Sequence, residues 1–153
     1  KGFNSSKFTP WPRKTEAPAA TPTATSVDFD ISGFLYNPHY DYDAATNSYR
    51  RSQGGKPHVD EKSGAQITPK VVLAMVMPYS VIQSADGYRS EYSTSGQGPL
   101  YIFQDGTLTT GIWKKADRKS PFQFLGPGDT PLPLNPGQTW VSMVEAENMI
   151  TYK

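Results

Sequence analysis

A two-residue turn between two alternating segments constrains the fold of this chain more than any other feature. Residues 98–104 and 107–115 alternate apolar and polar side chains on either side of Asp105-Gly106. Because a two-residue hairpin turn requires positive φ at both central positions, an Asp-Gly pair in this setting predicts a β-hairpin. A further apolar segment, at 134–143, is expected to return as a buried strand. The fold class follows from this pattern, whereas the chemistry of the protein does not.

The remaining sequence predicts further short strands separated by turns. Val27, Phe29 and Ile31 alternate with polar residues, which indicates a half-buried strand. The continuous apolar run at 71–77 favours a central strand covered on both faces, with a short buried helix as the less favoured alternative. About nine or ten such strands predict an all-β fold, either an antiparallel sandwich or a partly open barrel.

One β-rich domain, at 27–153, is expected behind a linker or extended N-terminal segment at 1–26. Residues 1–26 contain four prolines and five threonines, a composition typical of linkers because it offers little contiguous apolar surface. Trp11 within this segment is predicted to contact a partner. The 153 residues are too few for two domains of ordinary size.

Composition and motif spacing exclude several classes of function. Fifteen Lys plus Arg against fourteen Asp plus Glu leave no large net field to attract nucleic acid or an anionic membrane. The chain has no cysteine, and its longest apolar run is far shorter than the roughly 20 residues of a membrane-spanning helix. Serine-nucleophile and phosphate-binding spacings are missing. We therefore expect no cofactor, no metal, no nucleic-acid partner and no transmembrane segment in this chain.

The first residues lack the apolar region of a signal peptide. We therefore expect this sequence to be part of a longer protein.

Aromatic and charged residues concentrate on two predicted strands joined by one turn, at 40–43 and 49–51. As neighbouring strands they would place alternate side chains opposite one another. The pair can form a shallow groove in which tyrosine faces hold sugar rings and arginines hold carboxylates. Alternatively, it is a structural pair with ion pairs at the rim of the core. The residues concerned are Tyr40, Tyr42, Asp43, Tyr49, Arg50 and Arg51.

His58 and Asp60 are the weak catalytic candidates. They lie two residues apart on one face of an extended segment, where the carboxylate can orient the imidazole as a general base. A metal site needs about four ligands, and the sequence nominates no convincing third. A loop histidine bonded to a neighbouring carboxylate is the competing interpretation. Trp113 and Trp140, each in an alternating run, are predicted core residues.

A set of residues spread from about Phe29 to Val144 resembles, in order and spacing, the C-terminal domain of the YerB-like bacterial lipoproteins. The matching positions are Tyr42-Asp43, Tyr49-Arg50, Gly55, His58-Val59-Asp60, Gly64, Gln66-Ile67, Val71-Val72, Phe103-x-x-Gly106, Gly111-x-Trp113 and Leu134-Asn-Pro-Gly-Gln-Thr-Trp-Val141.

This resemblance implies a protein that carries a lipid on an N-terminal cysteine and is held outside the cytoplasmic membrane. It also implies a further domain preceding this one. Because the family is one of unknown function, the resemblance transfers no catalytic residue. It does draw attention to the region 40–60, where several matching positions cluster.

Three hypotheses follow from the sequence. The first is a non-catalytic envelope module that binds a protein partner or cell-wall glycan through Tyr40, Tyr42, Asp43, Tyr49, Arg50, Arg51, His58 and Asp60. The second is a cell-wall hydrolase or transferase that uses His58 with Asp60 or Asp43. The third is a structural domain that packs on an N-terminal domain of the same polypeptide.

Overall fold

The computed structural model describes residues 9–153, which form twelve strands and two short 3₁₀ turns. The strands are β1 (Ser26–Phe29), β2 (Pro38–Asp43), β3 (Ser48–Gln53), β4 (Lys56–Pro57), β5 (Val71–Val76), β6 (Tyr79–Ser84), β7 (Gly87–Tyr92), β8 (Gly96–Gln104), β9 (Thr107–Lys115), β10 (Gln123–Leu125), β11 (Thr139–Val144) and β12 (Ile150–Tyr152). The 3₁₀ turns are η1 (Pro127–Asp129) and η2 (Glu147–Met149). The all-β prediction is confirmed.

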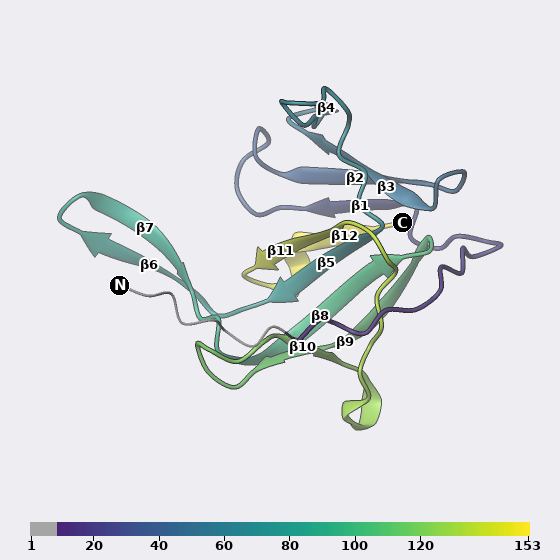
Figure 1. Ribbon diagram of the computed structural model, residues 1–153. Coiled ribbons are helices and arrows are strands. Elements are labelled where there is room, and N and C mark those ends of the chain that lie inside the picture. The colour runs from purple at the N-terminus through teal and green to yellow at the C-terminus, as the bar shows by residue number, and fades with distance from the viewer. Residues whose placement is uncertain (1–8) are drawn as a thin grey trace.

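Two five-stranded sheets face each other as an open sandwich, and a two-stranded hairpin projects from it (Figure 1). The first sheet has the order β12-β1-β2-β3-β4, and the second has the order β10-β9-β8-β5-β11. One pair departs from the predicted antiparallel arrangement, because β5 and β11 run parallel. The long excursion through β6 to β10 returns the chain to the end of the sheet where β5 began, so β11 enters in the same direction.

The predicted hairpin is β8 and β9, paired from Gly96↔Lys115 to Gln104↔Thr107. Both turn residues have positive φ, 58° at Asp105 and 73° at Gly106, as the Asp-Gly pair predicted. Gly106 is also required for packing, because a Cβ there would lie 2.6 Å from a ring carbon of Tyr42. The turn therefore touches the first sheet as well as closing the second.

Strand β5 is central and is covered on both faces. Val72 and Ala74 pack into the core between the two sheets, while Val71 and Leu73 pack on the other face around Trp113. Its continuous apolar run thus serves two cores, as expected for a strand buried on both sides. Strand β11 was expected to be buried but lies at the edge of the second sheet, where Trp140 is only half-buried.

The described part of the N-terminal segment, from residue 9, lies extended along the second sheet. Lys14 N donates to Leu134 O, and Leu134 N donates to Pro12 O. The Trp11 ring lies 4.7 Å from that of Phe124, and its Nε1 donates to Phe122 O at 2.9 Å. Trp11 therefore packs on its own domain, and its contact with a partner stays a prediction. Residues 1–8 of the predicted linker lie outside the described residues.

We expect Trp11→Ala to lower the free energy of unfolding by about 2 kcal/mol, because it removes a half-buried aromatic side chain that covers the second core. Urea unfolding followed by circular dichroism measures this change. Tyr88→Ala is the matched control, since Tyr88 is exposed and its loss should have little effect. Equal stability of both variants would contradict the structural role of the segment.

Candidate functional site

The paired strands β2 and β3 divide the predicted binding residues between two faces. Tyr40 lies opposite Arg51, and Tyr42 lies opposite Tyr49. Tyr40 and Tyr49 are fully buried in the core between the sheets, and burial raises the pKa of both phenols. Arg50 is exposed on the other face. The predicted groove is therefore not assembled as one surface, and a binding role for its exposed members stays a prediction.

Arg51 carries a guanidinium into the interior, where the side chain is only 5% exposed. Its Nε donates to the Tyr40 hydroxyl at 3.3 Å, and its Cζ lies 4.4 Å from the ring centroid of Trp140. The cation is held by aromatic faces. The His58 ring meets the same tryptophan edge-on at 6.0 Å. Trp140 thus connects the predicted residues Arg51 and His58 from the second sheet.

The carboxylates expected to assist His58 are engaged elsewhere. Asp60 Oδ1 accepts hydrogen bonds from the backbone N and the hydroxyl of Ser63, both at 2.8 Å, and these bonds lower the pKa of Asp60. Asp43 Oδ1 accepts from Ala45 N at 3.0 Å. Both carboxylates therefore stabilise turns. Within residues 9–153, neither forms a hydrogen bond with the His58 ring.

Tyr42 lies at the rim of the core, where its hydroxyl donates to Asn47 Oδ1 at 2.8 Å. Asn47 in turn leads to a polar network that the sequence did not reveal, because its members are far apart in the chain. Nδ2 of Asn47 and Nδ2 of Asn135 donate to Asp105 Oδ1 at 2.9 and 2.7 Å, and Lys14 Nζ pairs with Asp105 Oδ2. Burial raises the pKa of this carboxyl, but the three donors outweigh it and the pKa of Asp105 is lowered.

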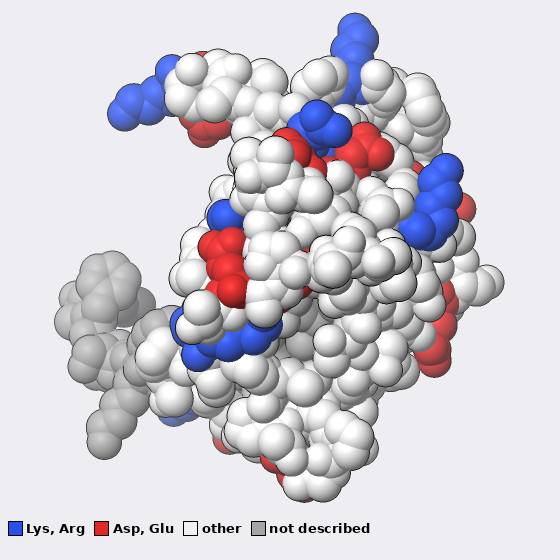
Figure 2. Space-filling model, turned by 90° about the vertical axis from the view of Figure 1, so that its right-hand side faces the viewer, with Lys and Arg blue, Asp and Glu red and all other residues white. Residues whose placement is uncertain are grey.

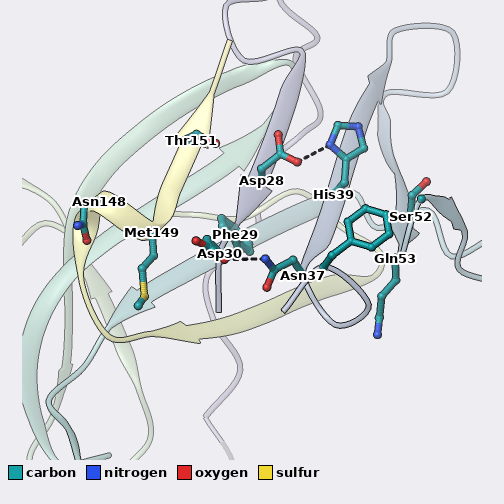
Figure 3. A pocket seen from close by; sticks show the side chains of 13 residues that line it. Asp28, Phe29, Asp30, Asn37, His39, Ser52, Gln53, Asn148, Met149 and Thr151 are labelled. Atoms are coloured by element: carbon teal, nitrogen blue, oxygen red, sulfur yellow. Dashed lines mark hydrogen bonds and ion pairs between the residues drawn. The ribbon is translucent and has the colours of Figure 1, made fainter. Parts of the chain in front are cut away.

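A pocket of about 620 Å³ opens on the outer face of the first sheet (Figure 3). Carboxylate, amide and hydroxyl groups line it together with apolar side chains, and they come from β1, β2, β3, the 30–37 loop and the chain around η2 and β12. The lining residues are Asp28, Phe29, Asp30, Phe34, Asn37, His39, Ser52, Gln53, Gly54, Gly55, Asn148, Met149 and Thr151.

His39 is held at one side of this pocket between two carboxylates. Its Nδ1 lies 2.7 Å from Asp28 Oδ1, and its Nε2 lies 3.2 Å from Asp41 Oδ1. Figure 3 shows the imidazole turned toward Asp28 across the neighbouring strands. Burial lowers the pKa of His39, but the hydrogen bonds and charges of the two carboxylates outweigh it, and the pKa is raised. The charged ring can donate to both oxygens at once.

The loop at 30–37 forms the rim of the pocket and is fixed by Asn37. Asn37 Oδ1 accepts from the backbone N of Ile31 and Ser32 at 3.0 and 2.8 Å, and its Nδ2 donates to Asp30 Oδ1 at 2.6 Å. The loop presents Phe34, which is 72% exposed, beside the cavity. The sequence predicts Ile31 in the half-buried strand, whereas β1 ends at Phe29 and Ile31 lies in this loop, because the Asn37 side chain binds the backbone N of Ile31 and Ser32.

The pocket was missed by the sequence analysis although two signals pointed to it. Alternation at 27–31 placed Asp28 and Asp30 on the polar face of their strand, and His39 is one of only two histidines. What the sequence did not reveal is that β12 pairs with β1 on the side away from β2. That pairing brings Asn148 and Thr151 to the same face.

Positive and negative side chains lie interspersed on the side of the molecule drawn in Figure 2, which is the right-hand side of Figure 1. Among residues 9–153, no three His, Asp or Glu side chains are grouped so that they could hold a metal ion. No helix in that range is long and apolar enough to cross a membrane.

A family model described as the C-terminal domain of a protein of unknown function (DUF3048) matches residues 27–141. The chain belongs to the DUF3048 family. The crystal structure of YerB from Bacillus subtilis is similar, with a TM-score of 0.76 at 21% sequence identity. The match covers 94% of this chain and 47% of the YerB chain, so this chain spans about half the length of YerB. No curated protein matches.

The predicted resemblance to the YerB-like C-terminal domain is therefore confirmed. At 21% identity the likeness to YerB shows a shared fold. Any function must be argued from the residues of this chain.

We expect Asp105→Asn to lower the free energy of unfolding at pH 7 by about 2 kcal/mol, because it removes a buried charge-assisted pair while keeping an acceptor oxygen. Since the carboxyl has a lowered pKa in the folded state, its contribution is present above the unfolded pKa and is lost as the pH falls through the folded pKa. The difference between wild type and variant should therefore shrink at acid pH. Denaturant unfolding at several pH values measures this, and an equal difference at all pH values would contradict the role of the charge.

We expect the His39 imidazole to titrate above its ordinary value of 6.5. Asp28→Asn should move the midpoint back toward that value, because it removes one of the two carboxylates. Asp43→Asn is the matched control and should leave the midpoint unchanged. NMR titration of the imidazole protons measures both. Because the folded-state pKa is raised, the small stabilisation by this group is complete below the unfolded pKa and is lost as the pH rises through the folded pKa.

Proposed function

We propose that this chain is a non-catalytic binding module of an extracytoplasmic bacterial lipoprotein, and that its outer-face pocket holds a cell-wall glycan. The observation that carries the proposal is the mixed lining of the pocket. A sugar presents hydroxyl groups at its edge and C–H groups on its faces. It therefore suits a site with convergent polar side chains beside an exposed aromatic ring.

The polar groups of the pocket match the edge of a sugar. Asn148 is exposed at one side of the cavity, and Ser52 and Gln53 lie on β3 at another. Amides can both donate to and accept from hydroxyl groups, and carboxylates accept from them. These residues provide oriented hydrogen bonds without a strong net charge.

Phe34 provides the apolar component at the rim of the pocket. Its ring is largely exposed, and it is presented by a loop whose backbone is already fixed by Asn37. Because the backbone of this loop is already fixed, ligand binding through Phe34 costs less conformational entropy than it would on a mobile loop. The envelope location and lipid anchor rest on the resemblance to YerB-like lipoproteins.

A protein partner is the second candidate for the same face. Leu35 and Tyr36 follow Phe34 in the 30–37 loop, and both are exposed. Three consecutive exposed apolar side chains on a fixed loop form a patch of the kind that marks protein contacts. The hydrolase alternative has less support, because neither Asp60 nor Asp43 orients His58.

Sedimentation with insoluble peptidoglycan tests the glycan proposal. We expect the wild-type domain to be retained, and Phe34→Ala and Asn148→Ala each to weaken retention by about ten-fold, a typical loss when one central contact is removed. Tyr88→Ala, on the projecting hairpin, should bind like wild type. Far-UV circular dichroism checks that each variant is folded.

Retention of Phe34→Ala equal to wild type would contradict this site. Failure of the wild-type domain to bind peptidoglycan would shift the proposal to a protein partner. Arg50→Ala tests the surface expected from the sequence, since Arg50 is exposed outside the pocket. Loss of retention on peptidoglycan in this variant would place the binding surface there instead of in the pocket.

A further inference from the structure

The hairpin of β6 and β7 projects from the sandwich (Figure 1). Two of its apolar side chains, Val81 and Tyr88, are exposed. The strands pair from Tyr79↔Tyr92 to Ser84↔Gly87 and form a sheet of their own. An isolated two-stranded hairpin is marginally stable in water. A hairpin of this length therefore requires packing on one of its faces to be held in place.

The register sorts the side chains of the hairpin into two unlike faces. Cross-strand partners share a face, and alternate residues along a strand point the same way. The pairs Tyr79↔Tyr92, Val81↔Ser90 and Gln83↔Tyr88 lie on one face, which therefore carries three tyrosines and Val81 together with the uncharged polar residues Gln83 and Ser90. The other face carries the charged Arg89 and Glu91, opposite Ile82 and Ser80.

The aromatic face packs against the sandwich at the base of the hairpin and is exposed to solvent toward the tip. At the base, the Tyr79 and Tyr92 rings lie 5.0 Å apart, and Tyr92 packs against the second core. Toward the tip, Val81 is 56% exposed and Tyr88 is 76% exposed. Exposed apolar residues on one face of a strand pair mark a contact surface. The neutral character of this face favours a partner surface that is itself largely apolar.

The path of the chain indicates which partner would cover this face. Trp11 and Tyr92 both pack against the second core, so the described N-terminal segment and the base of the hairpin share that core. The family model is described as a C-terminal domain, and this chain matches only 47% of the YerB chain. In a protein of YerB's length, a preceding domain would connect to this one through the N-terminal segment, whose Trp11 packs on the core shared with the hairpin base.

We propose that the aromatic face of β6–β7 docks on the domain that precedes this one in a polypeptide of YerB's length. Val81 and Tyr88 insert into an apolar surface of that domain, and the Tyr88 hydroxyl bonds to a polar group at its edge. This contact then fixes the orientation of the two domains relative to each other. This inference does not depend on the glycan site, which lies on the outer face of the first sheet.

Hydrogen exchange tests the docking. The measurement compares residues 79–92 in this chain alone and in the natural polypeptide extended toward its N-terminus to the length of YerB. We expect exchange to be at least about ten-fold slower in the long form, because docking adds to the free energy of opening the hairpin. A Val81→Ser, Tyr88→Ser double variant should abolish the added protection and leave the rest of the domain protected.

Phe34→Ser is the matched control, since it removes an exposed aromatic side chain from the pocket rim and should keep the protection at 79–92. Equal exchange in the short and long forms would overturn the proposal, as would an unfolded preceding segment. Protection that rises with the concentration of the short form would assign the face to a second copy of this chain instead. Because peptidoglycan binding depends on Phe34 and docking on Tyr88, the two proposals can fail separately.

Discussion

The Asp105 carboxylate holds together parts of the chain that no local interaction would join. Lys14 reaches it from the N-terminal segment, Asn47 from the β2–β3 turn and Asn135 from the segment before β11. It thereby ties the hairpin of the second sheet to the turn of the first. A buried charge is tolerated only when it is paired and hydrogen-bonded, so the three side-chain donors and the carboxylate depend on one another. The positive φ of Asp105 and the close packing of Gly106 on Tyr42 place the carboxylate where all three donors reach it.

Cores on both faces of β5 explain which surfaces remain free for binding. The first core lies between the sheets, and the second is closed by the N-terminal segment and by the chain around β10. The second sheet is therefore covered on both faces, whereas the first sheet keeps its outer face open. The pocket at His39 and Asn148 forms on that open face. Of the aromatic and charged residues at 40–51, Tyr40, Tyr49 and Arg51 lie in the interior, where Arg51 is held by Tyr40 and Trp140.

The two proposed contact surfaces follow from the same architecture. Apolar and polar side chains alternate along β1 and β2. The apolar side chains therefore lie in the core, and Asp28 and His39 lie on the outer face. The β6–β7 hairpin leaves the second sheet after β5 and rejoins it at β8, so it lies outside both cores except at its base. The sandwich thus carries a polar pocket on the outer face of the first sheet, and the β6–β7 hairpin carries exposed aromatic side chains outside both sheets. Rigid elements that position exposed groups are the usual basis of a binding module.

Short-range chemistry in the sequence determined the all-β class, the Asp105-Gly106 turn and the central strand at 71–76, because turn preference and side-chain period act over a few residues. The family resemblance was readable for the same reason, since it rests on local residues in order. Tertiary structure alone decided the parallel pairing of β11, the burial of Arg51 and the network at Asp105, because each joins residues distant in the chain. The pocket belongs to this second group. Asp28 and His39 become neighbours of Asn148 only when β12 closes the first sheet.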